Sequence, residues 1–248
     1  MELAIAPAAP GAAGRLAAVR QRIDDAARRA GRNPSDVTLV AISKTFTPEQ
    51  IMPAIEAGVT VLGENRVQEA EEKVGQLPST ITWHLVGHLQ KNKINKALEL
   101  FSLIHSLDSV AQCDAIGRRA EREGQPAHVL LQVNVTAKPS QFGFAEREVD
   151  AAAAHLAHVP GLRLEGLMCI APEVEDAEET RPYFQRLAAL HREVAARVRA
   201  AGHPWQHLSM GMSNDFPVAV EEGATLVRVG RAIFGERAAT PAAAQVEG

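Results

Sequence analysis

The strongest constraint on the fold is a regular alternation between short apolar runs and segments in which apolar residues recur at helical spacing. Eight apolar runs occur, at 37–43, 59–63, 81–86, 103–106, 129–135, 162–170, 207–210 and 226–230. Helical spacing fills the intervals, at 48–57, 66–74, 90–100, 110–122, 146–157, 177–201 and 214–222, and one more helical segment, 14–30, precedes the first run. Continuous apolar strands separated by helices are typical of a parallel sheet that is covered on both faces.

Eight strand and helix units predict a closed (β/α)8 TIM barrel, an α/β fold, with an extra N-terminal helix. The units use nearly all of the 248 residues, so we expect one domain over residues 13–237. The Ala- and Pro-rich stretches 1–12 and 238–248 are expected to be flexible tails. The alternative, an open doubly wound sheet, normally carries a glycine-rich nucleotide loop after its first strand. The corresponding segment here, VAISKT at 40–45, contains no glycine.

Composition excludes several classes of function. The 26 Lys and Arg against 30 Asp and Glu give a net charge of -4, which argues against a nucleic-acid partner. The only cysteines, Cys113 and Cys169, form no CxxC pair, so no disulfide framework or zinc site is indicated. His84 and His88 are four residues apart, but they lie on either side of a strand end rather than on one helix face, and no acidic motif accompanies them. We therefore predict no metal site. With no basic leader and no run of about 18 apolar residues, a cytoplasmic protein without a membrane partner is expected.

Residues at the ends of the strands are the first candidates for chemistry, because a barrel carries its active site at the carboxyl ends of its strands. Lys44 ends the first apolar run, and an amine at a barrel mouth suits Schiff-base formation with an aldehyde. A solvated lysine at a strand end is the alternative interpretation. Arg228 lies in the last run, and the first and last strands of a closed barrel are neighbours, so Lys44 and Arg228 are expected on adjacent strands.

A phosphate site is indicated by the last two units. Gly230 ends the eighth run, and 231–234 can form a short helix whose free N–H groups bind an anion. The loop 209–215 adds a second glycine, although Ser213 or Asn214 could simply cap the following helix. A lysine, an arginine and a phosphate-binding turn, all expected where the first and last strands meet, together predict a pyridoxal 5′-phosphate site.

Six segments carry a resemblance to a known family: VAISKT (40–45), LGENRVQE (62–69), WHLVGHLQKNK (83–93), GLMCIAP (166–172), LSMGMS (208–213) and VRVG (227–230). Together they resemble the YggS/PROSC family of pyridoxal phosphate homeostasis proteins. The resemblance spans about residues 14–237. It implies the fold-type III barrel that also forms the N-terminal domain of alanine racemase.

The resemblance also implies roles for individual residues. Lys44 is implied to form the aldimine, Ser213, Gly230 and Arg231 to hold the phosphate, and Arg228 to face the pyridine nitrogen. Position alone adds two polar candidates near the cofactor. Asn65 follows the second strand, with turn formation as its alternative, and His84 lies on the third, with a structural histidine as its alternative.

Three residues depart from the family pattern. In the loop after the fifth strand, Lys138 stands where the family usually has an acidic residue and Gln141 where it usually has lysine. Arg231 replaces a small residue, and its side chain is expected to add a charge-assisted contact to the phosphate.

Two classes of function remain open, a carrier and an enzyme. An arginine at the pyridine nitrogen only donates, so it weakens the electron sink that an acidic residue would create. The single tyrosine, Tyr183, lies in a predicted outer helix, which leaves no evident second acid or base for a racemase. We therefore predict a monomer or weak homodimer that holds pyridoxal phosphate and delivers it to apo-enzymes without catalysis of its own. The alternatives are a racemase-like enzyme and a Schiff-base aldolase using Lys44.

Overall fold

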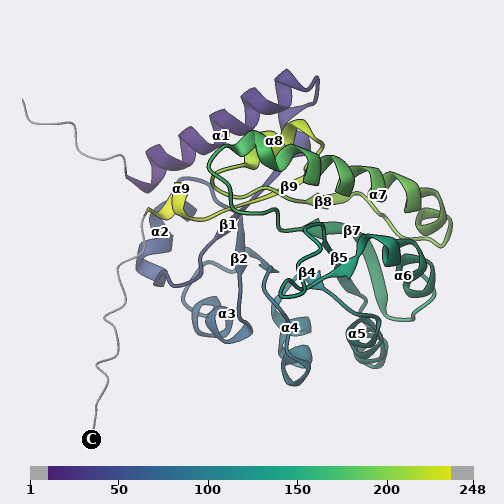
Figure 1. The fold of residues 1–248 in the computed structure, drawn as a ribbon. Coiled ribbons are helices and arrows are strands. Elements are labelled where there is room, and N and C mark those ends of the chain that lie inside the picture. Colours follow the sequence, from purple (N-terminus) through teal and green to yellow (C-terminus); the bar gives the residue numbers. More distant parts are fainter. Residues whose placement is uncertain (1–10, 236–248) are drawn as a thin grey trace, which may run out of the picture.

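The computed structural model describes residues 11–235, and the chain forms a parallel barrel surrounded by helices (Figure 1). The barrel strands are β1 (Thr38–Ile42), β2 (Val61–Glu64), β3 (Thr82–Leu85), β4 (Leu103–Leu107), β5 (Ala127–Asn134), β7 (Leu162–Cys169), β8 (His207–Ser209) and β9 (Leu226–Val229). β1 pairs with both β2 and β9, and the pairing of β4 with β5 closes the ring. The predicted (β/α)8 barrel is therefore confirmed.

One additional strand was not predicted. β6 (Phe144–Ala145) is only two residues long and pairs in parallel with the end of β5, through Val133 and Asn134. Residues 1–10 of the predicted tail 1–12 lie outside the described residues. At the end of that predicted tail, α1 already begins at Ala12. The predicted tail 238–248 lies wholly outside them.

The helices follow the predicted segments with small changes at their starts. They are α1 (Ala12–Arg29), α2 (Pro48–Glu56), α3 (Val67–Val74), α4 (Ile94–Leu100), α5 (Val110–Glu123), α6 (Val149–Leu156), α7 (Arg181–Ala200), α8 (Phe216–Glu221) and α9 (Arg231–Phe234). Separate 3₁₀ turns, Lys91–Lys93, Glu146–Glu148 and Ala177–Thr180, precede α4, α6 and α7, where one continuous helix was predicted; another, Pro34–Asp36, precedes β1. In α7 the change falls next to Pro182, which occupies the first turn of the helix and lacks an N–H.

The extra N-terminal helix lies across the last two units of the barrel (Figure 1). Arg15 Nε in α1 donates to the carbonyl of Ile233 in α9 at 2.7 Å. Beyond the helix end, Arg32 donates to the carbonyl of Val220 in α8 at 2.6 Å. These contacts tie the start of the described chain to α8 and to α9, the short helix that follows Gly230.

The strands are apolar on both faces, as expected for a barrel. One set of side chains, including Val40, Ile42 and Leu226, forms a small cluster inside the barrel. The alternate set, including Ala41 and Leu62, packs against the helices. Because side chains alternate along a strand, residues two positions beyond an interior residue share its direction. This alternation decides which residues reach the barrel mouth.

Candidate functional site

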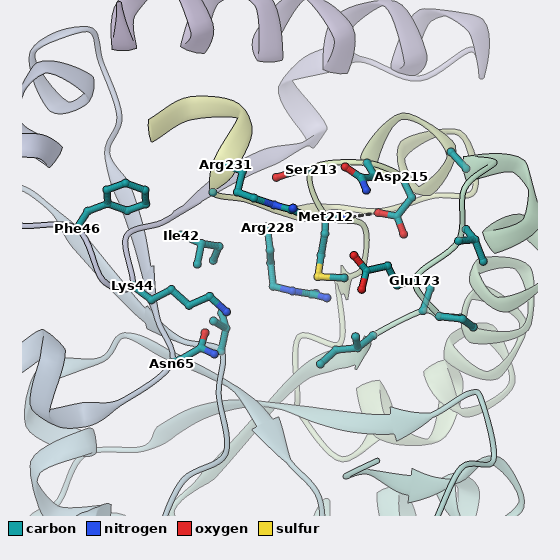
Figure 2. Close-up of a pocket in the computed structure, with 18 residues that line it drawn as sticks. Ile42, Lys44, Phe46, Asn65, Glu173, Met212, Ser213, Asp215, Arg228 and Arg231 are labelled. Carbon is teal, nitrogen blue, oxygen red and sulfur yellow. Dashed lines mark hydrogen bonds between the residues drawn. The ribbon is translucent and has the colours of Figure 1, made fainter. Parts of the chain in front are cut away.

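A cavity of about 700 Å³ opens at the carboxyl ends of the strands (Figure 2). Six of the seven predicted site residues line it: Lys44, Asn65, Ser213, Arg228, Gly230 and Arg231. They come from β9 and from the segments that follow β1, β2, β8 and β9. Lys44 lies two positions beyond the interior residue Ile42, and Gly230 two positions beyond Arg228. The strand alternation and the closure of the barrel therefore bring them together.

The backbone next to Lys44 is held by side chains of α3. Thr45 has a φ of 69°, an uncommon conformation for a β-branched residue. Its N–H donates to Glu69 Oε2 at 3.1 Å. On the other side of Lys44, the carbonyl of Ser43 accepts from Lys73 Nζ at 2.9 Å and from the N–H of Phe46 at 3.1 Å. The turn that follows Lys44 is thus fixed from outside the cavity.

A buried ion pair lies behind this turn, between β2 and α3. Lys73 Nζ is 2.7 Å from Glu64 Oε1, and the Ser43 hydroxyl donates to the same oxygen at 2.7 Å. Glu64 is fully buried, and burial raises the pKa of its carboxyl, outweighing the opposing effects of Lys73 and Ser43. Among the described residues, Glu64 Oε2 has no hydrogen-bond partner. This pair is therefore a sensitive support of the Lys44 backbone.

Two glycine turns, at Gly211 and Gly230, shape the segments that carry the lining residues Ser213 and Arg231. A Cβ on Gly230 would lie 3.1 Å from the carbonyl oxygen of Ile42 and 3.4 Å from its Cβ, so the side of Gly230 facing β1 has no room for a side chain. Gly211 has a φ of 88°, and a Cβ there would lie 2.6 Å from the Cβ of Ala219. Both turns depend on the absence of a side chain.

Asp215, rather than Ser213 or Asn214, occupies the N-cap position of α8, so the capping alternative considered for those two residues is wrong. Asp215 Oδ1 accepts from the N–H of Met212 at 2.6 Å, which shapes the loop. Asp215 is buried, and this burial raises the pKa of its carboxyl. Ser213 and Asn214 both line the cavity.

Arg228 forms the polar floor of the cavity and is only 5% exposed. Its Nη1 donates to Ser209 Oγ at 2.6 Å, and its Nη2 to the carbonyl of Cys169 at 2.7 Å. Burial lowers its pKa from the usual value of a guanidinium. Arg228 is aligned with Val40 in the β1–β9 pair, which confirms that Lys44 and Arg228 come from adjacent strands.

His84 is the predicted site residue that is not among the lining residues of the cavity. It lies inside the barrel, where its Nδ1 is 3.0 Å from Nε2 of His105. Burial, followed by the nearby His207, lowers the pKa of His84 to about 4. This environment matches the alternative interpretation of His84 as a structural histidine.

The sequence interpretation missed three groups. Glu173, in the loop after β7, lines the cavity, and Figure 2 shows its carboxylate on the side opposite Lys44. The same strand-end rule that selected Lys44 could have found it. His105 and Ser209 lie within strands, below the cavity, and only their polarity in otherwise apolar interior positions could have pointed to them.

The loop that departs from the family pattern is tied to the cavity wall. Gln141 Nε2 donates to the carbonyl of Ile170, a lining residue, at 2.8 Å. Asn134 Nδ2 donates to the carbonyls of Lys138 and Gln141 at 2.8 and 3.0 Å. Gln141 therefore fastens the β5 loop to the end of β7.

Comparisons with known proteins agree with this architecture. A family model for the alanine racemase N-terminal domain matches residues 15–238. The pyridoxal phosphate homeostasis protein of Aquifex aeolicus is 40% identical over 224 residues, which are 90% of this chain and 97% of the relative. The protein of the same name from Escherichia coli is 37% identical over 230 residues, covering 90% and 95%. This chain belongs to the pyridoxal phosphate homeostasis protein family. The family resemblance inferred from the sequence is confirmed.

A solved structure extends the comparison to the fold. PipY of Synechococcus elongatus, solved with pyridoxal phosphate bound, is 37% identical, with a TM-score of 0.78 and coverage of 90% of this chain and 100% of PipY. Within residues 11–235, no helix is both long and apolar enough to cross a membrane. The same range brings together no group of three or more His, Cys, Asp or Glu residues that could hold a metal ion.

Proposed function

We propose that the cavity binds pyridoxal 5′-phosphate through Lys44. The observation that carries the proposal is the convergence of Lys44, Arg228, Ser213 and Gly230 on one cavity. Family membership and the cofactor bound to PipY support it.

The residues present fit the chemistry of the cofactor. The absence of a side chain on Gly230 lets this turn lie against Ile42 of β1, and the Ser213 hydroxyl, the N–H of Arg231 and its guanidinium are donors suited to a phosphate. The neutral amine of Lys44 would condense with the aldehyde, forming an aldimine C=N bond and releasing one water. Arg228 would donate to the pyridine nitrogen, because a guanidinium has no acceptor atom.

The bound cofactor supplies an electron sink for amino-acid chemistry. Arg228 would leave the pyridine nitrogen without its own proton, which weakens that sink. We therefore propose that the protein stores pyridoxal phosphate and delivers it to apo-enzymes, without catalysis of its own. The curated relatives described above are named homeostasis proteins, in line with this role. We also propose that the protein acts in the cytoplasm as a monomer or weak homodimer. Neither nucleic acid nor a membrane is a proposed partner.

Covalent trapping tests the cofactor assignment. The purified protein is incubated with pyridoxal phosphate, reduced with borohydride and digested, and the modified peptide is identified by mass spectrometry. We expect the adduct on Lys44 and its loss in Lys44→Ala. Lys91→Ala, which removes an exposed lysine that does not line the cavity, is the matched control and should retain the adduct. An adduct at another lysine in the unsubstituted protein would refute the assignment.

A second candidate function, proton transfer at an amino-acid substrate, is favoured by Glu173. Its carboxylate lines the cavity that also contains Lys44, so the chain offers two groups for proton transfer. The loaded protein is incubated with L- and D-alanine in deuterated water, with and without an apo-enzyme. Delivery predicts activation of the apo-enzyme and no rapid α-proton exchange. Rapid exchange that is lost in Glu173→Gln would instead establish the catalytic function.

A further inference from the structure

A chain of buried polar groups runs from the cavity floor into the barrel. Arg228 Nη1 donates to Ser209 Oγ at 2.6 Å, and this oxygen is 2.8 Å from Nδ1 of His105. His105 Nε2 is in turn 3.0 Å from Nδ1 of His84. Ser209 and His105 are fully buried, and His84 is 7% exposed. The three residues below Arg228 lie on three strands, β8, β4 and β3, so the chain crosses the barrel interior.

The direction of these hydrogen bonds follows from the first member. A guanidinium carries donors only, so Ser209 Oγ must accept from Arg228. Within residues 11–235, the hydroxyl of Ser209 has one other hydrogen-bond partner, His105. If His105 Nδ1 carried a proton and donated, the buried hydroxyl hydrogen would have no acceptor, which is unfavourable. The hydroxyl therefore donates to Nδ1, and His105 carries its proton on Nε2.

The same reasoning extends to His84. Because His105 Nε2 donates, His84 Nδ1 accepts, and the proton of His84 lies on Nε2. Double protonation of His105 is disfavoured, because its ring is fully buried near the cation of Arg228 and near His84 and His207. Burial lowers the pKa of His105 well below the usual value, in agreement with a neutral ring.

We propose that Ser209 and His105 are positioning residues that orient Arg228 toward the cofactor, in a chain of hydrogen bonds that runs in one direction from Arg228 to Ser209, His105 and His84. Every member accepts from the side of Arg228, so the dipoles of the chain stabilise its positive charge. The effect on the cofactor rests on the proposed function, whereas the direction of the chain does not.

The other charged and titratable groups around Arg228 do not offer alternative hydrogen-bond partners for Ser209 or His105. Asp215 favours the charged form of Arg228, and the thiol of Cys169 lies near it, but neither is a hydrogen-bond partner of Ser209 or His105 among the described residues. His207 bonds through Nδ1 with the Thr225 hydroxyl at 3.1 Å. The ring of His105 is therefore aligned by Ser209 and His84.

Nitrogen-15 NMR of the apo-protein tests the direction without any cofactor. Histidine-labelled protein, with resonances assigned through the backbone, is measured between pH 6 and 8. We expect an unprotonated Nδ1 and a protonated Nε2 on both His105 and His84 throughout this range. A proton on Nδ1 of His105, or a doubly protonated ring, would overturn the proposal.

A double-mutant cycle tests the positioning role. Ser209→Ala should weaken binding of pyridoxal phosphate about tenfold, the effect of losing one hydrogen bond to a charged group, and should shift the visible absorption band of the loaded protein. In the Arg228→Gln background the same substitution should change the affinity less than twofold, because Ser209 acts through Arg228. An equal effect of Ser209→Ala in both backgrounds would overturn the role.

Controls separate positioning from general packing. Ser106→Ala removes another buried serine, whose hydroxyl donates to the carbonyl of Gly87 at 2.6 Å and takes no part in the hydrogen bonds between Arg228 and His84. This substitution should leave the affinity for pyridoxal phosphate within twofold. Ser209→Thr keeps the hydroxyl and should restore most of the affinity lost in Ser209→Ala. An affinity loss in Ser106→Ala as large as that in Ser209→Ala would count against the proposal. If the unsubstituted protein binds no pyridoxal phosphate, the proposed function fails, while the NMR measurement still decides the direction of the chain.

Discussion

The buried pair Glu64–Lys73 provides a sharp test of how the Lys44 backbone is supported. Lys73→Met keeps most of the length of the side chain but removes the donor that lies 2.7 Å from Glu64 Oε1 and 2.9 Å from the Ser43 carbonyl. Glu64 is fully buried, and only the Ser43 hydroxyl then remains as its partner. A buried carboxylate left in this way escapes mainly by taking up a proton.

The free energy of that protonation sets the magnitude. A carboxyl with a reference pKa of about 4.3 costs about 3.7 kcal/mol to protonate at pH 7 and about 1.6 kcal/mol at pH 5.5. We therefore expect Lys73→Met to lower the free energy of unfolding by about 3–4 kcal/mol at pH 7 and by about 2 kcal/mol at pH 5.5. The sign follows from the raised pKa of Glu64 in the folded state. Its contribution to stability is present at low pH and is lost as the pH rises through that pKa.

Urea denaturation at both pH values measures the effect. Two variants serve as controls. Glu64→Gln combined with Lys73→Met removes both charges and should recover much of the stability, with little dependence on pH. Lys96→Met, which removes a partly exposed lysine paired with Glu71 and Glu99, should change the unfolding free energy far less than Lys73→Met does. A loss in Lys73→Met that is the same at both pH values would refute the reasoning.

Three further outcomes are expected. Gly230→Val should weaken binding of pyridoxal phosphate by at least about tenfold but leave pyridoxal affinity nearly unchanged, as measured by fluorescence titration, because the added side chain would meet the Ile42 carbonyl and displace the turn that carries the N–H of Arg231. Gly166→Ala should destabilise the fold by about 2 kcal/mol or more in urea denaturation, since φ is 149° and a Cβ would lie 1.9 Å from the carbonyl oxygen of His207. Gln141→Ala should accelerate hydrogen exchange of the backbone amides of residues 136–138 and 140–143, because the bond to Ile170 is lost.

Most of the fold was predictable because each barrel strand is buried on both faces and reads as an apolar run. β6 was not, because two residues show no periodicity. The divided helices were missed for a related reason, since a 3₁₀ turn such as Ala177–Thr180 continues the helical spacing of α7. Tertiary geometry, rather than local pattern, sets these boundaries.

The site residues at the ends of strands were predictable, whereas those within the strands, beneath the cavity, were harder to predict. Lys44 and Gly230 end apolar runs and therefore stand out in the sequence. Ser209 and His105 lie within strands, where a polar residue has no local explanation, and their meaning depends on Arg228 lying close to both. His84 was selected for the cavity, but its actual partner is His105, 21 residues further along the chain.

The alternation of side chains along β1 and the turn after it separates two polar systems, one against α3 and one inside the barrel. Ser43 faces α3 and belongs to the Glu64–Lys73 pair, whereas Lys44 faces the cavity whose floor is Arg228. The hydrogen bonds of the two systems share no partner among the described residues. Their contributions to stability should therefore add, and the loss in Lys73→Met combined with Ser209→Ala should equal the sum of the single losses within about 0.5 kcal/mol. A larger deviation in urea denaturation would show that the outer pair and the inner hydrogen-bond chain are energetically coupled.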